Sequence, residues 1–177
     1  MSRCFYALWP DESTRAEITA AARSVPHHGR PVDPGNFHLT LVFLGGITKA
    51  QLEDLLQTTS DLHYPPFTLT LDHAGWWSGP RVLWLAPTLN PDPLSRLVEG
   101  LSDMAKRRGI PLDERPYNSH LTIARKVRDF EGAAVFKPVK WLVGEFRLLE
   151  SKSLKSGVVY VPLAAWPLTA ASPPVDR

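Results

Sequence analysis

One tetrapeptide, His-Leu-Thr followed by an aliphatic residue, occurs twice in this chain of 177 residues. The copies are His38–Leu41 and His120–Ile123, and nearly half of the chain separates them. Two full copies are expected by chance in far fewer than roughly one such sequence in a thousand. The repeat therefore predicts two equivalent lobes, each contributing one copy of the motif.

Each copy lies in an apolar run that is rich in strand-forming residues. Successive side chains of a strand point to opposite faces, so His and Thr share one face and the aliphatic residues share the other. Two such strands side by side would present two imidazoles and two hydroxyls to one ligand. This set of groups suits general acid–base chemistry on a phosphate ester.

Apolar periodicity, caps and turn residues together predict the order of elements along the chain. Strands are expected over 3–9, 37–44, 67–71, 81–86, 120–127, 141–151 and 158–163, and helices over 10–24, 49–59 and 91–108. Gly45–Gly46 is expected to end the first motif strand, and a turn is expected near Ser156–Gly157.

This order is that of an α+β fold. We expect one bilobal domain over residues 1–177, with two antiparallel sheets, outer helices, a pseudo-two-fold relation between the lobes and a central cleft. The Pro-rich tail, about residues 170–177, is expected to be flexible.

Composition narrows the class of protein. The chain is 44% hydrophobic and carries 20 basic and 18 acidic residues, a balance that argues against a polybasic binder of long duplexes. Cys4 is the single cysteine, which excludes a disulfide framework and a cysteine metal cluster. The apolar run over 4–9 is too short for a signal peptide, and no window is long enough to span a membrane, so we expect a cytoplasmic protein.

Basic residues gather around the second motif, where they would favour a phosphate-bearing ligand. They are Lys106, Arg107, Arg108, Arg115, Arg125, Lys126 and Arg128. The first three are interpreted as the end of a helix, where cations suit the helix dipole.

Three segments carry a family resemblance: Arg3–Leu8 (RCFYAL), His38–Gly45 (HLTLVFLG) and His120–Arg125 (HLTIAR). In their order and spacing the chain resembles the 2H phosphoesterase superfamily, and more narrowly the RNA 2′,3′-cyclic phosphodiesterases, also called 2′-5′ RNA ligase-like proteins. The resemblance implies a bilobal α+β fold whose motifs face each other across a cleft, with no metal and no other cofactor.

The same resemblance implies that His38, Thr40, His120 and Thr122 are catalytic. It also places Arg125 near the phosphate, although strand parity would point it away from His120 unless the strand bulges or ends there. Phe43 has the corresponding parity and is expected either in the core or at the cleft rim, where it would stack a base.

Hydrolysis of a 2′,3′-cyclic phosphate needs a base for the attacking water and an acid for the leaving ribose oxygen. Histidine suits both roles because its pKa is about 6.5. By resemblance, His120 is the base and His38 the acid on the 3′ oxygen, leaving a 2′-phosphate. The near-identical motifs do not by themselves distinguish the two roles. A 5′-hydroxyl in place of water would run the reaction backward and form a 2′-5′ linkage.

Alternatives stay open at this point. The substrate could be a 2′-5′ oligonucleotide or a small cyclic nucleotide such as ADP-ribose cyclic phosphate, or the chain could be a non-catalytic RNA-binding module; a monomer is expected. His27–His28 could contact substrate, Asp72–His73 could be imagined as metal ligands, and Trp76–Trp77 could line the rim. Solvated loop, no metal and core packing are the favoured interpretations of these three pairs.

The first prediction concerns metal. Exhaustive chelation with EDTA should leave turnover of a 2′,3′-cyclic nucleotide unchanged, because two histidines supply both proton transfers and the sequence has no metal-ligand spacing. Loss of turnover that zinc or manganese restores would contradict this mechanism.

Overall fold

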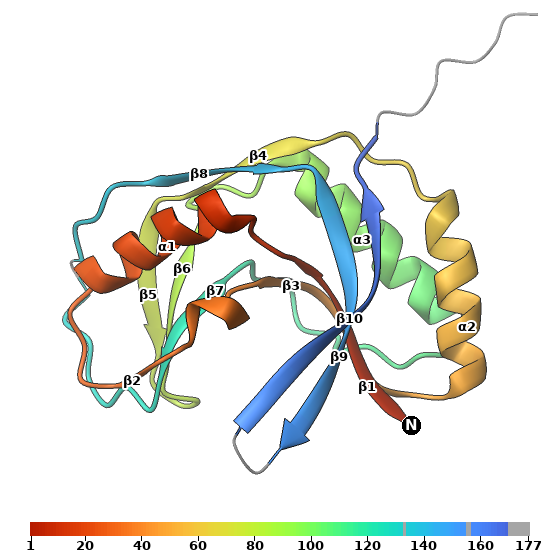
Figure 1. Cartoon of the computed structure of the whole chain (residues 1–177), viewed down its shortest axis with the longest axis horizontal. Coiled ribbons are helices and arrows are strands. Elements are labelled where there is room, and N and C mark those ends of the chain that lie inside the picture. The colour runs from red at the N-terminus through yellow and green to blue at the C-terminus, as the bar shows by residue number, and fades with distance from the viewer. Residues whose placement is uncertain (133, 155–156, 170–177) are drawn as a thin grey trace, which may run out of the picture.

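The computed structural model describes residues 1–132, 134–154 and 157–169 (Figure 1). Three α-helices are present in this part of the chain, α1 (Glu12–Ser24), α2 (Lys49–Thr58) and α3 (Asp92–Arg107), together with two short 3-10 helices, Pro34–Asn36 and Thr59–Asp61. The strands are β1 (Ser2–Leu8), β2 (Arg30–Pro31), β3 (Leu39–Ile47), β4 (Phe67–Leu71), β5 (His73–Trp77), β6 (Val82–Ala86), β7 (Leu121–Arg125), β8 (Val139–Val143), β9 (Glu145–Leu154) and β10 (Gly157–Pro167). None of the described helices is long and apolar enough to cross a membrane.

The strands form one large sheet in the order β10-β9-β1-β3-β7-β6-β5, with β2 paired to β7, and a separate pair of β4 with β8. All of these pairings are antiparallel, which confirms the predicted α+β class. The two motif strands, β3 and β7, are neighbours at the centre. The sheets expected for the two lobes are thus halves of one sheet, and a single residue pair, Leu39 with Leu121, joins β3 to β7.

The two faces of the large sheet differ in what covers them. On β1, Cys4, Tyr6 and Leu8 belong to the main core, together with buried residues of all three helices and of the β4–β8 pair. Phe5 and Ala7 point the other way and join a small apolar cluster with Leu149. In Figure 1 the β4–β8 pair runs along the top, α3 and α2 lie on the right, and the β9–β10 hairpin extends at the bottom.

Glycines explain three differences from the predicted elements. Gly45 does not end β3; it has a φ of +68° beside a register shift, and the strand continues to Ile47. Gly144 divides the strand predicted over 141–151, because β8 pairs with β4 while β9 pairs with β1. The Gly-containing strand β5 was not predicted at all. Ser156 of the predicted turn, and the tail 170–177, lie outside the described residues.

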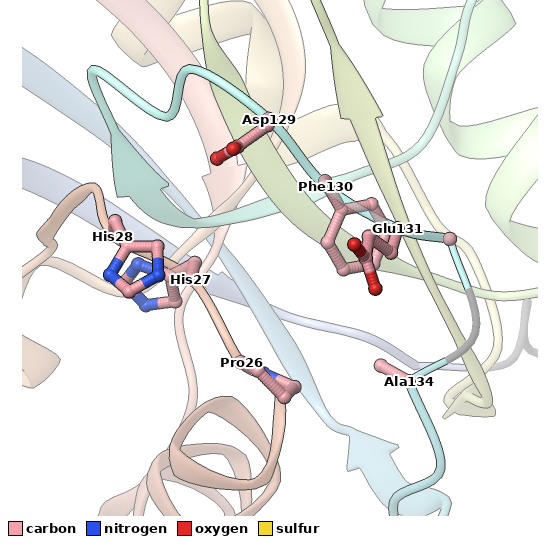
Figure 2. A pocket seen from close by; sticks show the side chains of 8 residues that line it. Pro26, His27, His28, Asp129, Phe130, Glu131 and Ala134 are labelled. Atoms are coloured by element: carbon pink, nitrogen blue, oxygen red, sulfur yellow. The ribbon is translucent and has the colours of Figure 1, made fainter.

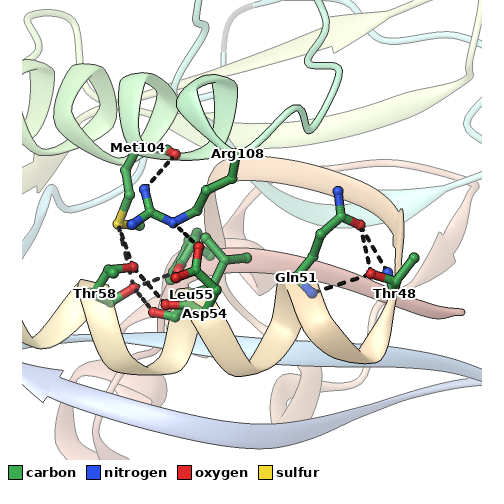
Figure 3. Close-up of polar contacts among 9 residues, drawn as sticks. Thr48, Gln51, Asp54, Leu55, Thr58, Met104 and Arg108 are labelled. Carbon is green, nitrogen blue, oxygen red and sulfur yellow. Dashed lines mark hydrogen bonds and ion pairs between the residues drawn. The ribbon is translucent and has the colours of Figure 1, made fainter.

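Polar contacts fix α2 beside α3 (Figure 3). Thr48 caps α2: its hydroxyl accepts from the Gln51 amide at 3.2 Å, and the Gln51 side chain accepts from the Thr48 amide at 3.0 Å. Arg108, at the end of α3, pairs with Asp54 of α2 with 2.5 Å between Nε and Oδ2. Helix α2, which follows the first motif strand, is therefore capped at its start and tied to α3 by an ion pair.

The second prediction concerns this cap. Thr48→Ala removes the hydrogen bond that the Thr48 hydroxyl accepts from the Gln51 backbone amide but keeps the bond from the backbone amide of residue 48 to the Gln51 side chain. The loss should lower the free energy of unfolding by about 1 kcal/mol in urea denaturation. Thr48→Ser keeps the hydroxyl and is the matched control. Turnover should stay at the wild-type level in both variants, because the cap makes no contact with the motifs; a loss of turnover without a loss of stability would contradict this separation.

Candidate active site

The two motifs meet at the centre of the large sheet. Because β3 and β7 are antiparallel and Leu39 pairs with Leu121, the register sets Thr40 opposite His120 and His38 opposite Thr122. Both leucines belong to the main core, so the His and Thr side chains point to the other face, called the histidine face below. The structure therefore brings all four predicted residues together.

Each histidine is anchored in the same way. His38 Nδ1 lies 2.7 Å from the carbonyl oxygen of Asn36, and His120 Nδ1 lies 2.8 Å from that of Asn118. A carbonyl oxygen can only accept, so Nδ1–H donates and the neutral ring leaves Nε2 without a proton. Asn stands two residues before both histidines, and this longer Asn-x-His-Leu-Thr repeat was visible in the sequence but missed.

A β-bulge lies at the last residue of each motif. On β3 the pairing with β1 passes from Thr40 to Val42, leaving Leu41 as the extra residue. On β7 the pairing with β6 passes from Thr122 to Ala124, leaving Ile123 as the extra residue. Both residues of each bulge are buried in the main core, so the alternation of faces is reversed beyond it.

The bulges decide the positions of Phe43 and Arg125, each five residues after its histidine. Phe43 pairs with Phe5 of β1, whose ring lies on the histidine face, and it is 46% exposed. The guanidinium of Arg3 lies 5.0 Å from the centre of the Phe43 ring. Phe43 is therefore not in the core; it lies on the histidine face.

Arg125 follows the bulge of β7 in the same way and is exposed. The bulge puts it on the histidine face, and its positive charge adds to burial, the largest cause, in lowering the pKa of both His38 and His120. Simple strand parity would have pointed Arg125 away, and the bulge at Ile123 is the physical reason that it does not.

Aromatic rings surround His38. Trp9 stacks on it with 5.8 Å between ring centres and 8° between planes. Phe5 and Tyr160 lie at 5.2 and 4.9 Å, the latter nearly perpendicular to the imidazole. Trp9 and Tyr160 come from the end of β1 and from β10, far from the motif in sequence, and no local signal in the sequence assigns them to the site.

His120 has a different neighbour, Trp77, with 4.5 Å between ring centres and 72° between planes. Trp77 in turn contacts Trp84 at 5.3 Å, and Gly75 leaves the space that the Trp84 ring fills, since an added Cβ would lie 2.2 Å from it. The pair Trp76–Trp77 thus divides between two environments. Trp76 packs against the core and donates to the carbonyl of Val127 at 3.2 Å, while Trp77 belongs to the site.

Burial is the largest cause that lowers the pKa of each histidine below its ordinary value. For His38 the hydrogen bond to Asn36 opposes this shift, while the charges of His120 and Arg125 add to it. For His120 the bond to Asn118 opposes and Arg125 adds. The two imidazoles therefore interact with each other and favour the neutral form near pH 7.

A hydrogen bond also crosses between the two motifs. The Tyr117 hydroxyl, three residues before His120, donates to the carbonyl of Thr40 at 3.1 Å. Burial raises the pKa of Tyr117, which keeps the hydroxyl protonated as a donor. The segment that leads into the second motif is thus tied to the first.

The remaining sequence candidates lie apart from this site. Asp72 accepts from the amide and hydroxyl of Thr88 at 2.7 and 2.9 Å, a structural role. His27 and His28 line a cavity of about 390 Å³ together with Phe130 (Figure 2), and His28 also lines a second cavity described below. Within residues 1–132, 134–154 and 157–169, no three His, Cys, Asp or Glu side chains are grouped to hold a metal ion.

The family model described as LigT like Phosphoesterase matches residues 8–84 and 86–160, and each segment contains one copy of the motif. The chain belongs to this family. It is 35% identical to the RNA 2′,3′-cyclic phosphodiesterase of Escherichia coli (strain K12) over 173 residues, covering 94% of this chain and 97% of the relative. It is 32% identical to that of Thermus thermophilus over 182 residues, covering 94% and 90%.

Solved structures agree with this membership. The structure of E. coli LigT complexed with 3′-AMP matches with a TM-score of 0.84 and 34% identity, covering 95% of this chain and 98% of that one. A further structure, described as a phosphoesterase, also matches with a TM-score of 0.84, at 32% identity and with 96% of this chain covered. The predicted family is confirmed. The predicted central cleft stays a prediction.

The third prediction follows from the lowered pKa values. Below about pH 6.5 the unfolded chain binds more protons at His38 and His120 than the folded chain, so the free energy of unfolding should fall as pH falls through this window. The double variant His38→Gln/His120→Gln should show a shallower decline in urea denaturation between about pH 7 and about pH 5. The exposed His63, changed to Gln, is the control; an unchanged slope in the double variant would contradict the prediction.

Proposed function

We propose that this chain hydrolyses RNA 2′,3′-cyclic phosphate ends to 2′-phosphate ends, with His38 and His120 as the acid–base pair and without a metal or other cofactor. One observation carries the proposal: two equally anchored imidazoles, each leaving Nε2 without a proton in its neutral form, meet on one face of the central strand pair. The names of the E. coli and T. thermophilus relatives support the choice of substrate.

The surroundings of the two histidines support different roles for them. Three aromatic rings lie within 6 Å of His38, and a ring stacked on an imidazolium stabilises its charge. Among the described residues, His120 has one aromatic neighbour, Trp77, and no ring stacked on it, while Arg125 disfavours a proton on both histidines. When the anionic phosphate binds and raises both pKa values, the added proton is better held by His38. His38 is then the acid on the ribose 3′ oxygen, and His120 is the base that takes a proton from water.

The other residues of the histidine face complete the reaction. The hydroxyls of Thr40 and Thr122 can donate to the non-bridging oxygens, and Arg125 can balance charge that develops on the phosphate. The exposed ring of Phe43 offers a surface on which the terminal base can stack. The same residues can catalyse the reverse reaction, in which a 5′-hydroxyl replaces water and a 2′-5′ linkage forms. Water at about 55 M favours hydrolysis.

Substrates of related chemistry are the second candidate. A 2′-5′ oligonucleotide or a small cyclic nucleotide presents the same phosphodiester to the same groups. A related structure holds 3′-AMP, a mononucleotide, which favours keeping this candidate. The non-catalytic alternative is disfavoured because both histidines and both threonines are present. The proposal includes a cytoplasmic, monomeric enzyme.

The fourth prediction separates the acid from the base. His38→Ala and His120→Ala should each lower turnover of a 2′,3′-cyclic nucleotide by at least about 100-fold. A phosphodiester with 4-nitrophenolate as leaving group needs little help from an acid, so it should restore turnover in His38→Ala far more than in His120→Ala.

His63→Ala, an exposed histidine outside the site, is the control and should behave as the wild type. Near-wild-type turnover in either active-site variant would overturn the two-histidine mechanism. Restoration of His120→Ala instead of His38→Ala would reverse the two roles. A 3′-phosphate product would show that the ribose binds in the opposite orientation.

A further inference from the structure

A second cavity, of about 750 Å³, lies where strands β2 and β6 begin and β7 ends. It is lined by His28, Gly29, Arg30, Arg81, Lys126 and Arg128, and is called the basic pocket below. Four of these six residues carry a permanent positive charge, and none is acidic. The chain as a whole has a net charge of only +2, so positive charge is concentrated here.

Strand register explains why these cations meet. Arg30 of β2 pairs with Arg125 of β7 on one side, and Val82 of β6 pairs with Arg125 on the other. Arg81 directly precedes β6 and Lys126 directly follows β7, so both lie where three strands end. The amide of Val127 donates to the carbonyl of Arg81 at 3.1 Å and closes this end of the sheet.

Two of the cations occupy strained backbone. Arg81 and Lys126 have φ values of 56° and 58°, in the left-handed region that Gly or Asn adopts more readily. A long side chain there costs roughly 1 kcal/mol or more. Strain of this kind occurs both in hairpin turns and at ligand-binding sites, and here two charged residues of one pocket share it.

Among the described residues, none of the four cations of the pocket takes part in an ion pair. The ion pairs found among the described residues involve other cations, such as Arg108 with Asp54 and Arg147 with Glu145. Several unpaired cations around one cavity match a ligand with more than one negative charge. A nucleic-acid backbone is such a ligand, because each nucleotide carries one phosphate.

The pocket adjoins the active site through strand pairing, because Arg30 of the pocket pairs directly with Arg125 of the histidine face. The charge of Arg125 in turn lowers the pKa of both histidines, for which burial is the largest cause. We propose that the basic pocket binds the backbone phosphates of the RNA nucleotides that precede the cyclic end. This inference rests on the proposed function and deepens it: the preferred substrate is an RNA chain rather than a mononucleotide.

The fifth prediction compares two substrates, 2′,3′-cyclic AMP and an RNA oligonucleotide ending in a 2′,3′-cyclic phosphate. Arg30→Gln/Arg128→Gln should lower kcat/KM for the oligonucleotide at least about tenfold at 0.1 M salt and leave the mononucleotide unchanged. The slope of log binding constant against log salt should become shallower by about 1.4, the value for two lost contacts to single-stranded nucleic acid. Lys106→Gln/Lys140→Gln removes two exposed charges elsewhere and should change neither substrate's kinetics.

Direct binding of a fluorescent oligonucleotide with a 3′-terminal phosphate keeps the test independent of turnover. If the wild type turns over neither substrate but the Arg30/Arg128 variant loses oligonucleotide binding, the pocket stands and the proposed function fails. Equal effects of the two double variants on the oligonucleotide would overturn the pocket. Loss of binding to inorganic phosphate to the same degree as to the oligonucleotide would assign the pocket to a small anion and overturn the backbone site.

Discussion

The candidate active site depends on one backbone pair, Leu39 with Leu121, through which the two halves of the large sheet meet. Because strands β3 and β7 run in opposite directions through this pair, each motif histidine lies across from the threonine of the other motif. The leucines fill the core beneath, so packing energy holds the register. A shift of either strand by one residue would turn its His and Thr into the core.

The matched β-bulges extend this symmetry to the next two functional positions. Leu41 and Ile123 are each the third residue after a motif histidine, and each is the extra residue of a bulge. Their effect is to return Phe43 and Arg125 to the histidine face. The same kind of bulge thus places an aromatic ring, Phe43, from one lobe and a positive charge, Arg125, from the other on the histidine face.

The two histidines are equivalent in their motifs but differ in the side chains that surround them. The histidines have the same anchor, a carbonyl two residues earlier, but different neighbours: Trp9 and Tyr160 at His38, and Trp77 at His120. Hydrolysis of a cyclic diester needs one proton donor and one acceptor, and identical surroundings would not separate them. The asymmetric packing of the lobes, rather than the motifs, is what we propose assigns the two roles.

The sequence by itself determined the α+β class, the four motif residues and the family, because a repeated short pattern with strand periodicity is a local signal. The Asn that precedes each motif was equally readable. The bulges could not be predicted from the sequence, because a register shift depends on the partner strand. The sequence therefore did not decide on which face of the sheet Phe43 and Arg125 lie. Trp9, Tyr160, Trp77 and the basic pocket were decided only by the tertiary structure, because strands distant in the chain bring their residues together there.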